Sequence, residues 1–204
     1  MNNLQEFLDK CASMHRHLCP RQVIGVRMGL YAGEILKLEL PQMDKRLYTI
    51  AETDGCAADG ISVATNCWVG RRTMRIEDYG KVAATFVDTL TGKAIRIAPE
   101  KDVRTAVIAY VPGEESTWES QLRGYQLMPA EELFSFQWAR LVRPISEIIS
   151  RSGRKAICDR CGEEIMNERE ITVNAITLCK ACAGQAYYLV ENAEVVSTYI
   201  LPAF

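Results

Sequence analysis

The amino-acid sequence predicts an α+β protein in which a larger domain of helices and strands precedes a small module held by cysteines. Three patterns carry this prediction. Apolar residues recur at helical spacing over Pro20–Leu38. Lys81–Asp88 and Ala94–Ala98 flank a short turn containing glycine, as the two strands of a β-hairpin do. Two CxxC pairs then lie near the C-terminal end.

The first half of the chain is expected to alternate helices with strands. The apolar residues of Asn3–Met14 fall on one helical face, which predicts a short amphipathic helix before the long one. Leu47–Glu52 alternates well enough to form a strand, and Gly55 permits a tight turn after it. Asp59 is a suitable N-cap for a short helix that ends at about Cys67.

The second half continues with a short strand at Met74–Ile76 and the hairpin. Helical patterns follow at Lys101–Tyr110 and Ser116–Leu127, and Pro129 is suited to open another short helix. Phe134–Val142 alternates aromatic with other residues and fits either a strand or a helix.

The composition is that of an ordinary globular chain, with 204 residues, 48% hydrophobic and 25% charged. There are 24 Lys and Arg against 26 Asp and Glu, so no basic excess favours a nucleic-acid partner. No signal sequence is evident, and no apolar run approaches the roughly 18 residues of a membrane span. We therefore expect a cytoplasmic protein, in which clustered cysteines indicate metal or thiol chemistry rather than disulfides.

Both histidines of the protein lie in one short stretch, at His15 and His17, followed by Cys19 and Pro20. In an extended segment, alternate residues point the same way, so these three side chains can face one point in space. Pro20 suits the first turn of a helix, and a thiolate is stabilised at such a helix end. The simpler interpretation is a pair of loop histidines beside a buried cysteine.

Cys56 is a fourth candidate ligand, because it follows a predicted strand in an Asp-Gly-Cys turn. Two imidazoles with one or two thiolates suit Zn²⁺, with iron or copper as the less favoured metals. If only three of the four side chains bind, one coordination position stays open for water or substrate, as in a catalytic zinc site.

The C-terminal module contains the pairs Cys158, Cys161 and Cys179, Cys182, separated by 17 residues. This spacing predicts a closed, structural four-cysteine zinc site in a treble-clef or ribbon arrangement, with short strands between the pairs and a helix at Ala183–Glu191. A redox dithiol is the alternative for either pair. The module is slightly acidic, which favours a protein contact over nucleic acid. A polar stretch around residue 150 predicts two domains, at 1–150 and 151–204.

Several motifs follow one another in order: His15-x-His17-x-Cys19-Pro20 with Gly25-x-Arg27-Met28-Gly29, then Glu52-Thr53-Asp54-Gly55-Cys56, Asp78-Tyr79-Gly80-Lys81-Val82-Ala83 and Thr91-Gly92-Lys93-Ala94. Together they resemble the FmdE family, named for one of the subunits of the molybdenum or tungsten enzyme formylmethanofuran dehydrogenase. The resemblance covers roughly residues 10–145, and the C-terminal region resembles the zinc finger common in this family.

The resemblance implies an α+β core with a mixed sheet flanked by helices, somewhat thioredoxin-like, and a metal site at His15, His17, Cys19 and Cys56. One residue departs from the family pattern, which usually has Gly at the position of Arg21. A cation beside the site would narrow access or bind an anionic substrate.

The function expected from this resemblance is that of a metal-binding protein accessory to a molybdenum or tungsten oxidoreductase of one-carbon metabolism, as in methanogenesis. The alternatives are a free-standing zinc enzyme with an open site, and a thiol redox protein that uses Cys19 and Cys56. The sequence names no substrate. The apolar segment Val195–Leu201 follows a module too small to bury it, so we also expect a homodimer.

Overall fold

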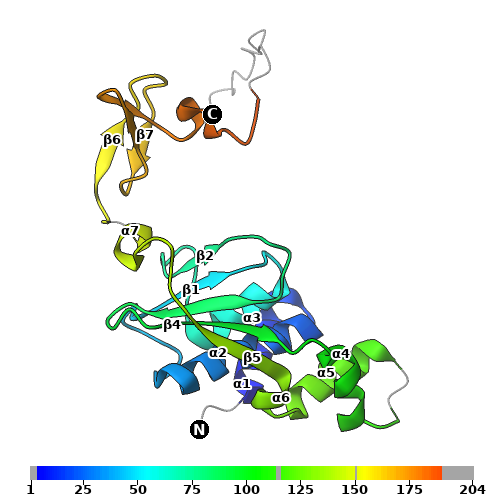
Figure 1. Cartoon of the computed structure of the whole chain (residues 1–204). Coiled ribbons are helices and arrows are strands. Elements are labelled where there is room, and N and C mark those ends of the chain that lie inside the picture. Colours follow the sequence, from blue (N-terminus) through cyan, green and yellow to red (C-terminus); the bar gives the residue numbers. More distant parts are fainter. Residues whose placement is uncertain (1–3, 114–115, 150, 190–204) are drawn as a thin grey trace, which may run out of the picture. The chain divides into compact units, whose positions relative to one another are not determined.

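The computed structural model describes residues 4–113, 116–149 and 151–189, which belong to two compact units, Met1–Ile149 and Ser150–Phe204 (Figure 1). A five-stranded sheet with the order β2-β1-β3-β4-β5 forms the first unit's framework. Its strands are β1 (Leu47–Ala51), β2 (Met74–Ile76), β3 (Ala84–Asp88), β4 (Ala94–Pro99) and β5 (Phe134–Ala139). Only the β1–β2 pair among these is parallel, so the expected mixed sheet is confirmed.

Helices α1 (Leu4–His15), α2 (Pro20–Leu36) and α3 (Cys56–Thr65) pack against one face of this sheet. Strand residues alternate between faces, so Phe86 joins the main core with these helices, while its neighbour Val87 points the other way. That opposite face is covered by α7 (Ile145–Ile149) through Ile148. The sheet is therefore flanked by helices, as expected.

The segment between β4 and β5 is helical and contains α4 (Val103–Ala106), the 3₁₀ turn η1 (Val107–Tyr110), α5 (Thr117–Leu127) and α6 (Ala130–Leu133). The Ser116 hydroxyl accepts a hydrogen bond from the Glu119 amide at 3.1 Å and caps α5, which explains where that helix begins. Phe134–Val142, left open between strand and helix, forms β5 as far as Ala139 because β4 pairs with it along its whole length.

The second unit contains two hairpins, β6 (Lys155–Ile157) with β7 (Glu164–Met166) and β8 (Ile171–Val173) with β9 (Ile176–Leu178). A helix was expected from Ala183 to about Glu191, of which residues 190–191 lie outside the described ranges. As far as Leu189 there is instead a single turn, η2 (Ala181–Gln185), because Gly184 has φ 85° and leaves the helical region. The segment 195–201, on which the dimer expectation rests, lies outside the described residues.

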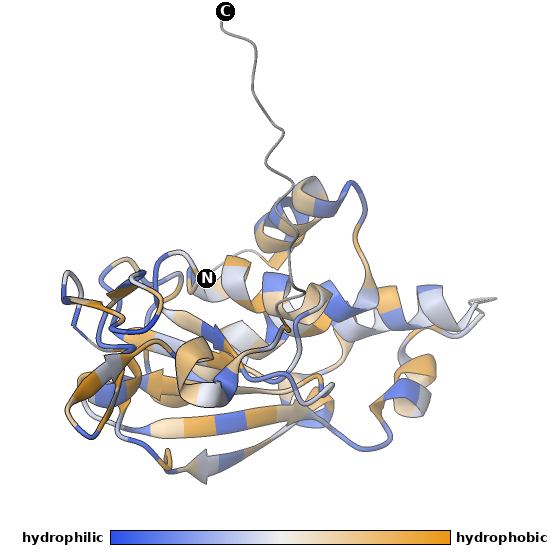
Figure 2. Ribbon diagram, turned by 90° about the horizontal axis from the view of Figure 1, so that it is seen from above, coloured by the Kyte–Doolittle hydropathy of each residue, from blue (hydrophilic) through white to orange (hydrophobic). Residues whose placement is uncertain are grey.

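Hydrophobic and polar residues are interleaved along the helices and strands (Figure 2). None of the helices in the described ranges is long and apolar enough to cross a membrane.

Helices α2 and α3 approach each other so closely that glycine is required at the contact. A Cβ atom on Gly25 would lie 2.1 Å from the Ala57 carbonyl oxygen, and one on Gly60 would lie 2.3 Å from the Gln22 carbonyl oxygen. These distances are far below any van der Waals contact, so both positions demand a hydrogen in place of a side chain. This contact fixes the first turn of α3 against the first turns of α2.

Candidate functional site

The α2–α3 contact brings two predicted ligands together, because each thiol lies at the start of one of these helices. Cys19 is the extended residue that precedes α2, and Cys56 is the first residue of α3. The Cys19 amide donates to the side-chain oxygen of buried Gln22 at 2.8 Å, and the Gln22 side-chain amide donates to the Cys11 carbonyl. This network links the end of α1 to the start of α2 and holds the Cys19 backbone in place.

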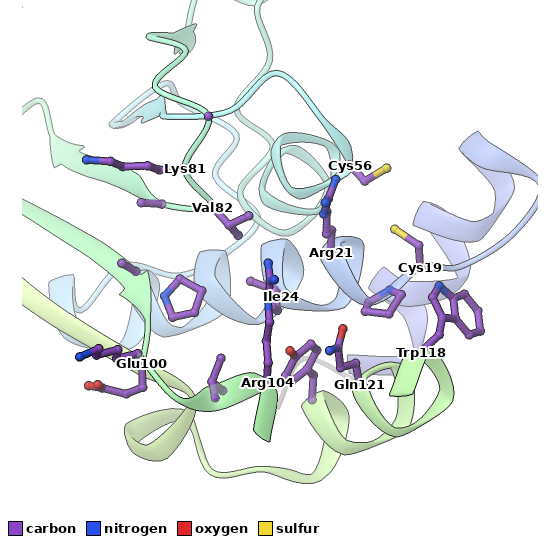
Figure 3. Close-up of a pocket in the computed structure, with 18 of the residues that line it drawn as sticks. Cys19, Arg21, Ile24, Cys56, Lys81, Val82, Glu100, Arg104, Trp118 and Gln121 are labelled. Atoms are coloured by element: carbon purple, nitrogen blue, oxygen red, sulfur yellow. The ribbon is translucent and has the colours of Figure 1, made fainter. Parts of the chain in front are cut away.

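The two thiols are neighbours. Burial raises the pKa of Cys56, and the nearby Cys19 thiol raises it further. Figure 3 shows both side chains at the same end of a pocket. Asp59 was expected to cap α3, but Gly55 is its N-cap and Asp59 lies in its first turn.

The expectation about Asp59 was wrong because the N-cap lies four residues earlier, at Gly55. Asp59 is therefore inside α3, and its carboxylate has another partner. His15 Nε2 lies 2.8 Å from Asp59 Oδ2. The rings of His15 and His17 meet edge to face, with centroids 6.4 Å apart. The structure thus brings Cys19 near Cys56, and His15 near both Asp59 and His17. The four predicted ligands, however, do not form as tight a group as the C-terminal cysteines.

The C-terminal cysteines form a ready metal site. The four sulfur atoms of Cys158, Cys161, Cys179 and Cys182 all lie within 4.8 Å of one another, and in the described ranges no other set of three or more metal-binding side chains is so close. Four thiolates in this arrangement fit tetrahedral zinc. The Cys179 amide donates to the Cys158 sulfur at 3.3 Å, and the Cys182 amide donates to the Cys179 sulfur at 3.4 Å.

Backbone donors favour the charged form of one thiol in particular. Amides of Cys161 and Cys179 lower the pKa of Cys158 to about 6, which favours the thiolate that binds metal. In contrast, a hydrogen bond with Cys179 raises the pKa of Cys182 to about 12. The residues present therefore fit a structural zinc ion, whose charge would stabilise all four thiolates.

A pocket of about 860 Å³ adjoins the Cys19 and Cys56 thiols. Figure 3 shows Cys19 and Trp118 at one end, Lys81 and Val82 at the opposite wall, and Arg21 and Arg104 between them. The full lining comes from five regions of the chain: Cys19, Pro20, Arg21 and Ile24; Cys56; Gly80, Lys81, Val82 and Ala83; Arg96, Ala98, Pro99, Glu100, Lys101, Val103 and Arg104; and Trp118, Gln121 and Tyr125.

Glu52 organises one wall of this pocket. Its carbonyl accepts hydrogen bonds from the amides of Tyr79 and Lys81, both at 3.0 Å, which holds the loop that carries Lys81. Its buried carboxylate binds the Arg96 guanidinium in a bidentate pair, at 2.6 and 2.7 Å. This pair raises the pKa of Arg96 and neutralises its charge within the wall.

Sequence reasoning missed Asp59 as a partner of His15, as well as Lys81, Lys101, Arg104 and Trp118 as pocket residues. The Asp59 signal was available, because a residue three positions after Cys56 lies on the same helical face. The pocket residues carry no common spacing and are assembled only by the fold.

Comparison with known proteins places this site in a family context. Residues 14–135 match the model of the family described as FmdE, molybdenum formylmethanofuran dehydrogenase operon. Residues 151–188 match the prokaryotic DksA/TraR C4-type zinc finger. The resemblance and the zinc finger expected from the sequence are thereby confirmed.

Two individual proteins are also similar. A probable S-adenosyl-L-methionine-binding protein of Archaeoglobus fulgidus is 28% identical over 218 residues, which cover 96% of this chain but only 57% of the relative. This chain therefore spans little more than half the length of that relative. The crystal structure of a tungsten formylmethanofuran dehydrogenase FmdE-like protein from Syntrophus aciditrophicus superposes with a TM-score of 0.59 at 18% identity, covering 91% of this chain and 95% of that one. At this identity the likeness concerns the fold.

Proposed function

Because the chain belongs to the FmdE family, we propose that it is a metal-binding protein with a functional site in its first unit and a structural zinc site in its second. The zinc-finger match and the convergence of four cysteine sulfurs support the structural site. Such a site supplies folding free energy, on the order of 10 kcal/mol, to a module that buries few large side chains.

The observation that carries the functional site is the meeting of Cys19 and Cys56 beside the His15–Asp59 pair. Cys19, Cys56, His15 and His17 would hold the metal, and zinc suits this donor set. Asp59 would orient the His15 ring, as carboxylates do for many metal-binding histidines. Bound zinc supplies Lewis acidity or an acidified water at any coordination position that the protein leaves open.

We further propose that the protein acts as an accessory to a molybdenum or tungsten oxidoreductase of the formylmethanofuran dehydrogenase type, in one-carbon metabolism. The family description supports this role. Copurification of the full chain from a native host tests it. A stable complex with molybdopterin enzyme subunits is the expected result, whereas reproducible isolation of the chain without them would contradict the proposal.

A free-standing zinc enzyme is the alternative that the open pocket beside the thiols favours. Turnover by the isolated, metal-loaded chain would identify it. A metal-free thiol redox function is favoured by the Cys19–Cys56 contact. It requires these two residues to form a disulfide under mild oxidant.

The name of the Archaeoglobus fulgidus relative raises S-adenosyl-L-methionine as a ligand. This molecule has a sulfonium, an ammonium and one carboxylate, so its net charge is positive and is repelled by the cations that line the pocket of this chain, Arg21, Lys81, Lys101 and Arg104. We therefore propose that this pocket takes a different class of ligand.

We also propose a homodimer that depends on the second unit or on the apolar segment Val195–Leu201. Truncation after about Ser150 should then weaken self-association in analytical ultracentrifugation. An equally tight dimer from the truncated chain would assign the interface to the first unit.

A further inference from the structure

We infer that the pocket beside Cys19 and Cys56 binds an organic anion, with its acidic group on Arg21 and Arg104 and its uncharged body against Trp118. This inference rests on the proposed function, because it assigns a ligand class to the same site. It does not require the metal to be bound.

The charge of the pocket lining favours an anionic ligand. Five cationic side chains and one acidic side chain, Glu100, line the pocket. Arg96 is neutralised by its bidentate pair with Glu52. Among the described residues, the side chains of Arg21, Lys81, Lys101 and Arg104 form no ion pair with a carboxylate. Cations gathered in a concave site raise the local concentration of anions, so the free pocket is poised for a negative ligand.

The position of two of these cations favours Arg21 and Arg104 as the residues that bind the acidic group. Arg21 comes from the first turn of α2 and Arg104 from α4, and Figure 3 shows both between the thiol end and the wall that carries Lys81. Guanidinium groups in the lining of one cavity can bind the oxygens of a carboxylate, sulfonate or phosphate. Cys19 and Cys56 line the same pocket as these arginines, so a molecule held there shares the pocket with both thiols.

The size and the apolar part of the lining indicate an organic ligand rather than a bare inorganic anion. The pocket volume of about 860 Å³ lies within the range of about 300–1,000 Å³ that is usual for small-molecule sites. Ile24, Val82 and the half-exposed ring of Trp118 offer apolar surface. An inorganic phosphate would leave this surface in contact with water, whereas a ring or chain attached to the acidic group would cover it.

The probe for this inference is 8-anilinonaphthalene-1-sulfonate, which carries one acidic group on aromatic rings and fluoresces when removed from water. We expect the full-length chain to bind it in the pocket. Arg21→Gln and Arg104→Gln should each weaken binding by about fivefold, the factor for one partly exposed charged contact. Trp118→Ala should also weaken binding, and inorganic phosphate should displace the dye only weakly.

The matched control is Arg140→Gln, since Arg140 is an exposed arginine outside the pocket and two residues from exposed Trp138. Loss of dye binding in Arg140→Gln with unchanged affinity in Arg21→Gln and Arg104→Gln would overturn the inference, because the dye would then bind the β5 surface. If inorganic phosphate displaced the dye at low concentration, the claim that the ligand is an organic anion would be overturned.

Zinc content measured on the same samples separates this inference from the proposed metal site. His17→Ala, at a proposed ligand outside the pocket lining, should lower the zinc content while it changes the arginine-dependent dye binding by less than about twofold, which is less than the loss of one exposed charged contact. Unchanged zinc in His17→Ala with dye binding weakened in the arginine variants would contradict the metal site alone. Reduced zinc with arginine-independent dye binding would contradict the anion pocket alone.

Discussion

His15 and Asp59 lie 44 positions apart in the sequence, yet His15 Nε2 is 2.8 Å from Asp59 Oδ2. An ionised carboxylate only accepts hydrogen bonds, so Nε2–H of His15 donates to it, and in the neutral ring Nδ1 is then the nitrogen with a free lone pair. The contact joins the end of α1 to the first turn of α3, where Asp59 lies three residues after Cys56. It therefore orients the His15 ring.

Asp59→Asn should reduce zinc affinity at the first unit's site by about 10- to 100-fold, the usual effect of losing a carboxylate that orients a metal-binding histidine. Competition with a chelating dye measures this affinity. Asp54→Asn is the control, because it removes an equal charge from the residue just before the N-cap of α3, and Asp54 forms no ion pair with His15. Equal losses in the two variants would show a general charge effect and contradict the specific role of Asp59.

Gly25→Ala should destabilise the first unit by about 3 kcal/mol or more, because its Cβ would lie 2.1 Å from the Ala57 carbonyl oxygen and must force α2 and α3 apart. All three tryptophans belong to the first unit, so their fluorescence during urea unfolding reports on that unit. Gly70→Ala is the control, with no heavy atom within 4 Å of the added Cβ. A Gly25→Ala loss no larger than that of Gly70→Ala would show that the helices are not in such close contact.

Asp88→Asn should cost about 1–2 kcal/mol of unfolding free energy at pH 7, because the buried carboxylate accepts hydrogen bonds from Arg46, Leu90 and Thr91 at the end of β3. The Arg46 guanidinium, followed by the Thr91 hydroxyl and the Leu90 amide, holds the pKa of Asp88 well below its usual range. The stabilisation is therefore complete above the unfolded-state pKa of about 4 and is lost as the pH falls below it.

Urea unfolding of the wild type and Asp88→Asn between pH 7 and pH 2 measures this effect. The difference between the two proteins should shrink below about pH 4. Asp102→Asn, which alters an exposed acid, should change stability little at any of these pH values. A difference for Asp88→Asn that stays constant across the range would mean that the ionised carboxylate is not the stabilising group.

The fully metallated chain should contain two zinc equivalents that leave in order during stepwise chelation. The site of Cys19 and Cys56 should lose its metal first, because an open position admits the chelator, whereas four thiolates close the second site. Metal analysis of the wild type, Cys56→Ser and Cys161→Ser should give two, one and one equivalents. A single equivalent in the wild type that persists in Cys56→Ser would show that the first unit holds no metal.

Local patterns predicted much of the fold. Pro20 and the apolar residues after it predicted α2, and the glycine-containing turn predicted the β3–β4 hairpin, since both depend on neighbours in sequence. The conformation of Phe134–Ala139 depended instead on pairing with β4, from which a helical segment separates it in the chain. The sequence left that region undecided because tertiary pairing determined it.

In the candidate site, too, local sequence predicted some features and tertiary contacts determined the others. The closeness of Cys158, Cys161, Cys179 and Cys182 follows from their spacing, so it was predictable. The start of α3 was misplaced at Asp59, because Gly and Asp both serve as N-caps and nothing local distinguishes them. The pocket around Cys19 depends on residues from five regions of the chain, so its charge became visible only in the fold.

The central claim is that Cys19 and Cys56 bind one metal ion, and alkylation mapped by mass spectrometry tests it most directly. A thiolate bound to zinc has its electron pair engaged and resists alkylation, whereas a free thiolate at a helix start reacts readily. The full-length protein would be treated with iodoacetamide when metal-loaded and after chelation. We predict that Cys19 and Cys56 are protected together in the loaded protein and become labelled together after chelation. Rapid labelling of Cys19 in the metal-loaded protein would contradict the claim and favour the thiol redox alternative.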